Sequence, residues 1–298
     1  MGNFSIDFII MKKLLTSPLW GACGAVLLLL LLASCSDIEP EDRLVYHPQP
    51  QAERAVLIED FTGQKCVNCP EMADELTKLA NNYGHDKVIV VAHHSGSFSQ
   101  GVAASMNPLR NDESQWYFDY FKMNAQPAVI VNHSGSIINM PNEVAAPLAS
   151  ALAKKTPITI EGGASIDNDQ PEHPQLKVWA KLSTVETVEN VSLMVWVIEN
   201  GITAVQFLPG NKVERNYTHN HVFRESLTTV EGANLGTLAA GSNIERNLGT
   251  SIKDAWNKDN LEVVIVALKN NVVENVKKIE VQELLTKLFT PDKTAMYW

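Results

Sequence analysis

Long apolar runs, basic clusters and cysteines are all scarce in this chain of 298 residues. Its most apolar stretch, residues 19–33, falls short of the roughly 18 to 20 residues that a membrane-spanning helix needs, which disfavours a permanent transmembrane anchor. After residue 13 there is no cluster of lysine or arginine, and the formal net charge is −10. Because a basic patch is what phosphate binding requires, we do not expect nucleic acid as a partner.

The first 34 residues have the organisation of a signal peptide, with Met11 as the expected start. Lys12 and Lys13 precede the apolar stretch, which ends in the order Leu, Ala, Ser, Cys at residues 32–35. This is the order of a bacterial lipobox, so we expect Cys35 to carry a lipid that ties the chain to a membrane. An ordinary cleaved signal peptide followed by a chance cysteine is the alternative. Residues 35–52, rich in acidic residues and proline, are expected to form a flexible tether.

Four cysteines are present, and only two of them are available to the folded protein. Cys23 leaves with the signal peptide and Cys35 is blocked by lipid, so Cys66 and Cys69 can only pair with each other. The compartment beyond the inner membrane permits disulfides, and the pair can therefore exist in its oxidised form.

Two domains are expected in the roughly 260 residues that remain after the signal peptide, because one core seldom serves a chain of that length. Residues 53–155 contain a βαβ pattern, with apolar strands at 55–61 and 88–92 around an amphipathic helix that follows Cys66. A helix at 114–121, a strand at 128–131 and a helix at 142–155 complete this α/β domain.

Strands dominate the second expected domain, residues 156–298, which ends in a short C-terminal tail. They are predicted at residues 158–161, 176–182, 191–199, 204–207, 219–227 and 261–268. Val178, Ala180 and Leu182 alternate with polar or aromatic neighbours, which indicates an antiparallel sheet with one solvated face. We expect an all-β sandwich.

The spacing Cys66-x-x-Cys69, between a buried strand and an amphipathic helix, is typical of a redox site. The start of the helix presents free N–H groups and the positive end of its dipole, which stabilise a thiolate on Cys66, and Lys65 would lower the pKa of that thiol further. Cys69, about one turn along, is placed to attack a mixed disulfide formed on Cys66.

Two other roles remain open for the cysteine pair: a static structural disulfide, or part of a metal site. A structural zinc site normally has four ligands. His93 and His94 are the nearest further candidates, but neighbours on a strand point to opposite faces, so they would not both reach one metal ion.

A second histidine pair, His219 and His221, lies two residues apart on the strand predicted at 219–227. Such spacing places both imidazoles on one face, which suits a metal pair. No third ligand is evident, and we expect a structural or surface-exposed pair instead, with no metal site.

Further residues resemble the arrangement in thioredoxins. Asp60 lies six positions before Cys66, where thioredoxins keep a buried carboxylate that relays a proton for the second cysteine. Gln126 and Pro127 resemble the cis-proline loop that packs against the disulfide and presents backbone to a bound peptide. The resemblance implies a catalytic set of Cys66, Cys69, Asp60 and Pro127, with Lys65 and Gln126 as substrate contacts.

Nearly the whole chain resembles the Omp28-related outer-membrane lipoproteins. The resemblance is carried by LASC at 32–35, VLIEDFTGQKCVNCP at 56–70, AQPAVIVN at 125–132 and YTHNHVFR at 217–224. It implies a thioredoxin-like α/β domain followed by a β-sandwich, and an outer-membrane location on the periplasmic face or the cell surface.

Thiol–disulfide exchange with extracytoplasmic protein or peptide thiols, with no organic cofactor, is the leading functional hypothesis. The alternative is a binding lipoprotein, an adhesin or receptor component, in which the thioredoxin-like unit is a scaffold and the disulfide is static. Fold alone does not decide between them.

Overall fold

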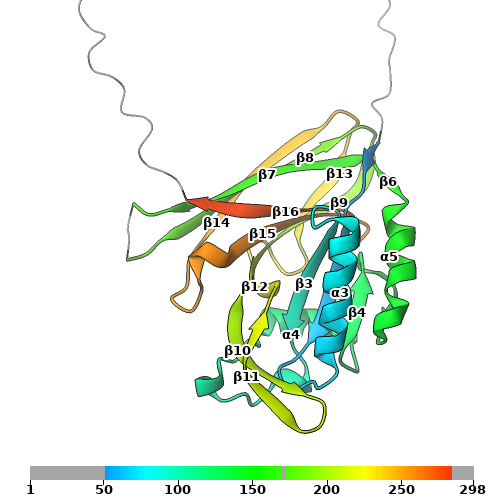
Figure 1. Ribbon diagram of the computed structural model, residues 1–298. Coiled ribbons are helices and arrows are strands. Elements are labelled where there is room, and N and C mark those ends of the chain that lie inside the picture. The colour runs from blue at the N-terminus through cyan, green and yellow to red at the C-terminus, as the bar shows by residue number, and fades with distance from the viewer. Residues whose placement is uncertain (1–50, 170–171, 284–298) are drawn as a thin grey trace, which may run out of the picture. The chain divides into compact units, whose positions relative to one another are not determined.

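The computed structural model describes residues 51–169 and 172–283, so the expected signal peptide, the lipobox and most of the tether lie outside the described residues (Figure 1). The order of elements in the first part is β1 (Ala52–Glu53), β2 (Val56–Thr62), α3 (Cys69–Tyr83), β3 (Val88–His94), α4 (Asp112–Tyr120), β4 (Ala128–Val131), β5 (Ser134–Ile138), α5 (Ala145–Leu152) and β6 (Lys155–Thr156). Three short 3-10 helices lie between these elements, at Ser97–Ser99, Ala104–Met106 and Pro141–Glu143.

The predicted βαβ pattern is confirmed by β2, α3 and β3, in which the two strands are parallel. Every residue of both strands is buried, as expected of apolar runs covered on two faces. The apolar stripe of α3 (Met72, Leu76, Leu79) and Leu148 of α5 pack on one face of these strands. The helix ends at Gly84, whose positive φ of 103° and N–H bond to the Ala80 carbonyl close the last turn.

The other face of β2 and β3 is covered by an aromatic core. Phe61, Tyr117 of α4, Trp196 and Phe223 pack there against apolar side chains from strands of the second part. Sequence-distant segments therefore cover the βαβ unit from the side opposite α3.

The second part is almost entirely β-structure, as predicted. Its strands are β7 (Ile158–Asp167), β8 (Gln175–Thr184), β9 (Val188–Glu199), β10 (Ile202–Leu208), β11 (Lys212–His219), β12 (Val222–Ser226), β13 (Ala233–Leu238), β14 (Asn243–Ser251), β15 (Leu261–Lys269) and β16 (Val272–Glu283). One apolar core joins the inward residues of β7 and β8 to those of β9 and β15, which gives sandwich-like packing. The predicted alternation in β8 is confirmed, since Val178, Ala180 and Leu182 are buried and Lys177 and Trp179 are exposed.

Both parts share one large sheet, in the order β14-β8-β7-β16-β15-β9-β12-β3-β2-β4-β5. The junction is β12, which pairs antiparallel with β9 and parallel with β3. Next to it, the Ala92 N–H donates to the carbonyl of His221 at 2.8 Å. The chain is therefore a mixed α/β protein with a large sheet, which confirms the coarse fold class, and the domain boundary at residues 155 and 156 stays a prediction.

Two predicted elements differ from those observed. The strand expected at 219–227 is instead the end of β11 at His219, a turn, and then β12 from Val222. His221 has a positive φ of 58° in that turn, so the expectation that His219 and His221 share a strand face is wrong. The helix expected at 142–155 is shorter: α5 begins at Ala145 after a 3-10 turn and ends at Leu152.

None of the helices in the described ranges is long and apolar enough to cross a membrane.

Candidate functional site

Cys66 and Cys69 form a disulfide with a Cα–Cα distance of 5.4 Å. Each cysteine is only 2% exposed. The helix α3 begins at Cys69, with Asn68 as its N-cap, so Cys66 lies in the turn before the helix and not at the helix start as expected. The free N–H groups of the first helical turn therefore lie next to Cys69 in sequence.

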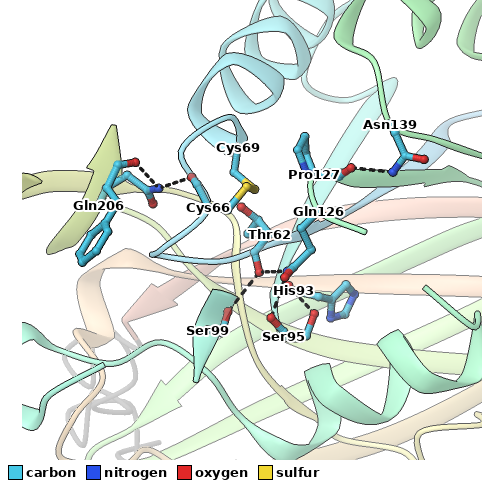
Figure 2. The surroundings of a disulfide bond; sticks show 11 residues. Thr62, Cys66, Cys69, His93, Ser95, Ser99, Gln126, Pro127, Asn139 and Gln206 are labelled. Atoms are coloured by element: carbon cyan, nitrogen blue, oxygen red, sulfur yellow. Dashed lines mark hydrogen bonds between the residues drawn. A yellow bond between two sulfur atoms is a disulfide. The ribbon is translucent and has the colours of Figure 1, made fainter. Parts of the chain in front are cut away.

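The hairpin of β10 and β11 covers the disulfide loop. The Gln206 side chain in β10 donates its Nε2 hydrogen to the Cys66 carbonyl at 2.9 Å (Figure 2), and the N–H of Phe207 donates to the Gln64 carbonyl at 2.8 Å. The side chain of Gln64, just before the cysteines, is fully buried and donates in turn to the Val205 carbonyl. These bonds hold a hairpin from the second half of the chain against the cysteine loop.

Gln64 and Gln206 were not predicted from the sequence. Their partners lie about 140 residues apart in the chain, and a glutamine in a polar turn or a short strand carries no local signal of such a contact. Only the tertiary arrangement brings them together.

Gln126 and Pro127 lie on the side of the disulfide opposite Gln206 (Figure 2). The bond between them is cis. The Gln126 side chain donates its Nε2 hydrogens to the carbonyls of Thr62 and Ser95 at 2.6 and 3.0 Å, which fixes the loop to the ends of β2 and β3. The Pro127 carbonyl accepts a bond from Asn139 at 2.7 Å, while no hydrogen bond among the described residues engages the backbone of Gln126.

Lys65 is half-buried, and its N–H donates to the carbonyl of Phe98 at 2.9 Å. Its ammonium lies beside Gly101, where an added Cβ would be 3.2 Å from Nζ. The structure thus directs the Lys65 side chain toward the 96–111 segment.

Asp60 lies at the end of β2 and is 3% exposed. Burial raises the pKa of its carboxyl from 3.8 to about 7. Both Asp60 and Cys69 line one cavity of about 260 Å³ between α3, β3 and the end of β11. The structure thus places a carboxyl group that is partly protonated at neutral pH on the same cavity as the second cysteine.

Three histidines line the same cavity: His94, His219 and His221. The rings of His94 and His219 are 5.1 Å apart between centroids. Burial lowers the pKa of His219 and of His221 to about 4, and burial together with the charge of His219 lowers that of His94 well below its ordinary value. His219 is only 6% exposed, so of the two options expected for it, structural or surface-exposed, the surface position is excluded. Among residues 51–169 and 172–283, no group of three or more His, Cys, Asp or Glu side chains is arranged to hold a metal ion.

A second buried polar cluster, which the sequence did not reveal, lies on the opposite face of β2 and β3. Glu59 contacts Nε2 of His133 at 2.7 Å and Nε2 of His93 at 3.3 Å, with all three side chains buried. Burial pushes the pKa of Glu59 upward, but the charge of His133 and hydrogen bonds from both histidines outweigh it and hold the pKa at about 2. His93 also stacks on Phe61, so this cluster is part of the aromatic core and away from the disulfide.

Comparison with known proteins adds four findings. The family model described as outer membrane protein Omp28 matches residues 114–284, and no curated protein matches the chain. The solved structure of HBP35 of Porphyromonas gingivalis has a similar fold, with a TM-score of 0.62 at 14% identity over 83% of this chain and 82% of that one. A domain of the outer membrane lipoprotein Omp28 from the same organism matches 43% of this chain and 90% of its own length at 15% identity, with a TM-score of 0.30.

Proposed function

Because the chain belongs to the Omp28 family of outer membrane proteins, which confirms the location expected from its sequence, we propose that it is a lipid-anchored thiol–disulfide exchange protein of the outer membrane. Residues 53–155 act as its thioredoxin-like unit, and Cys35 carries the lipid. The observation that carries this proposal is the shared cavity of Cys69 and the buried carboxyl group of Asp60.

The exchange starts when a thiolate of a protein or peptide dithiol attacks Sγ of Cys66. The Cys66–Cys69 bond breaks, and Cys69 leaves as a thiolate that takes the proton of Asp60. The second thiolate of the substrate then attacks the substrate sulfur bound to Cys66, and Cys66 leaves as a thiolate. The substrate loses two electrons and forms a disulfide, while the cysteine pair gains them; the reverse sequence reduces a substrate disulfide.

Asp60 suits this role because its pKa of about 7 lets it both give and take a proton near neutral pH. The unengaged backbone of Gln126 offers a docking edge for an extended substrate chain, with Pro127 shaping the groove beside it. Val67, between the cysteines, and Phe98, bonded to Lys65, are exposed apolar side chains that provide further contact area.

One observation favours a second function, that of a binding lipoprotein, an adhesin or receptor component, with a static disulfide. Each cysteine is only 2% exposed, and Gln206 of the β10–β11 hairpin is bonded to the Cys66 carbonyl, so little of the disulfide is open to a substrate thiolate. A disulfide closed in this way resists exchange and stabilises its loop instead.

Trapping distinguishes the two functions. A Cys69→Ser variant of the full chain, expressed in the native outer membrane, should accumulate mixed disulfides on Cys66 because the second thiol is gone. A Cys66→Ser, Cys69→Ser double variant is the control. Equilibration of the wild-type protein with glutathione buffers should give a reduction potential above about −300 mV, the value below which structural disulfides typically lie. A disulfide that stays oxidised in these buffers, together with no trapped species, supports the static function.

A further inference from the structure

A buried proton donor needs a route by which it regains its proton. Asp60 is 3% exposed, and once it has given a proton to Cys69 its carboxylate is charged in a poorly solvated place. Asp60 is shielded from bulk water except along the cavity that it shares with Cys69. Its proton therefore returns through the waters and polar groups of that cavity.

The cavity wall holds such groups. Within the described residues, four buried atoms on it lack a hydrogen-bond partner: Oδ1 of Asp60, Nδ1 of His94, Nε2 of His219 and Nδ1 of His221. A cavity of about 260 Å³ has room for several waters, since each occupies about 30 Å³ in the liquid. Waters bonded to these four atoms would satisfy them and connect them.

His219 is the histidine best placed between the buried end and the solvent. It is the last residue of β11. The centroid of its ring lies 5.1 Å from that of the buried His94 ring and 4.8 Å from that of the half-buried Tyr217 ring. Exposed Asp74 of α3 and exposed Thr218 and Asn220 also line the cavity, so the cavity reaches the surface beside His219.

We propose that His219, which the β10–β11 hairpin brings into this cavity, passes protons between Asp60 and the solvent during thiol–disulfide exchange. The inference rests on the proposed exchange function. Its imidazole is neutral at pH 7, because burial lowers its pKa to about 4. Its Nε2 is therefore an unpaired acceptor that orders cavity water along the route and takes up a proton only transiently. His219 acts through Asp60 and touches neither sulfur in the mechanism, so it is a positioning and proton-transfer residue.

The same geometry gives the hairpin a second role. Gln206 and His219 lie on the two strands of one hairpin, the first bonded to the Cys66 carbonyl and the second on the cavity of Cys69. The hairpin in its observed position therefore holds both the Cys66 loop and the proton route.

Single-turnover reduction of the full-length protein by dithiothreitol, followed by alkylation and mass spectrometry between pH 6 and 8, tests the proposal. His219→Gln should slow reduction by about ten-fold or more, since positioned proton transfer typically contributes a factor of 10² or more. The reduction rate of the wild-type protein should show a solvent deuterium isotope effect, and the size of this effect should differ in His219→Gln. Imidazole added to His219→Ala should restore the rate, and the exposed His173→Gln should match the wild type.

The possible failures are distinguishable. A wild-type disulfide that dithiothreitol does not reduce in the folded protein overturns the exchange function and, with it, the role of His219. A wild type that reacts while His219→Gln keeps its rate and isotope effect overturns the role of His219 alone. If the His219 variants do not fold, ¹⁵N-histidine NMR compares the titration of His219 in the wild type and in Asp60→Asn. An identical His219 titration in both proteins overturns the link between His219 and Asp60.

Discussion

The side-chain amide of Gln206 donates a hydrogen bond to the backbone carbonyl of Cys66, across 140 residues of sequence. A strand of the second half of the chain is thereby bonded directly to the disulfide loop of the first half. The bond is buried, so its loss has consequences for both access and stability.

Gln206→Leu should expose the disulfide. The substitution removes the shorter of two bonds to the Cys66 carbonyl and leaves only the 3.4 Å bond from the Cys69 N–H, at a cost of about 0.5 to 1.5 kcal/mol in the free energy of unfolding. Reduction by dithiothreitol, measured by alkylation and mass spectrometry, should become several-fold faster. The control is Gln175→Leu, which removes an exposed bond to Ser251; equal rates in both variants would show that the hairpin does not limit access.

Asp60→Asn should stabilise the folded protein at pH 8. The carboxyl pKa is raised from 3.8 to about 7 in the folded state, so between these values the folded protein binds a proton that the unfolded chain has lost. Stability contributed by this group therefore falls as the pH rises through that window, and above it the buried charge costs about 1 to 4 kcal/mol. Urea denaturation at pH 5 and pH 8 measures the difference, with exposed Asp254→Asn as the control.

His219→Gln should make the protein lose less unfolding free energy as the pH falls from 7 to 5. The folded-state pKa of His219 is lowered from 6.5 to about 4, so the unfolded chain binds a proton first as the pH falls. The stability that this group contributes is fully present above pH 6.5 and is lost toward pH 4, which amounts to about 2 kcal/mol at pH 5. The difference in unfolding free energy between pH 7 and pH 5 should shrink accordingly in His219→Gln and stay unchanged in His173→Gln.

Glu59→Gln should be strongly destabilising. The carboxylate lies between two buried imidazoles, and a neutral amide loses the charge-assisted contacts with both, at a cost of about 1 to 3 kcal/mol for each contact. Glu53→Gln, which breaks an exposed pair with Lys87, serves as the matched control and should change little. Chemical denaturation at pH 7 checks both; a small effect of Glu59→Gln would mean that the core accepts a neutral amide there.

Cys35→Ala should release the protein from the membrane. Acyl chains supply the membrane affinity of a lipoprotein, and the unmodified chain should be extracted without detergent. Fractionation with metabolic lipid labelling measures this. Unchanged labelling and partitioning would contradict the lipobox assignment.

Local patterns in the sequence predict those elements that are a continuous apolar run or have apolar residues at a regular spacing. β2 and β3 are continuous apolar runs, and α3 has buried residues at helical spacing, so each was predicted within a few residues. β11, with the sequence KVERNYTH, was missed because all but two of its residues are exposed, and an exposed hairpin strand has no apolar pattern.

The site was only partly predictable for a related reason. The cysteine spacing and Asp60 are local features, whereas Gln206 and His219 reach the site through pairings that no spacing encodes. The turn at His221 was not predicted, because Asn220 and His221 stand between two extended segments without a glycine or proline to mark a turn. The positive φ of His221 cannot be inferred from the residue type. Glu59 was similarly hidden, since a charged residue inside an apolar run suggests a surface position until its histidine partners are known.

The distance along the chain between Cys66 and Gln206 also fixes an order of assembly. Ribosomes and export channels deliver the N-terminal part of a chain first, so Cys66 and Cys69 emerge while the 140 residues up to Gln206 are still to come. An oxidant meets both thiols during that interval, before any hairpin exists to cover them. Once β10 and β11 have folded onto the loop, the bond that formed early is enclosed, and a hairpin that arrives later determines how accessible this covalent link remains.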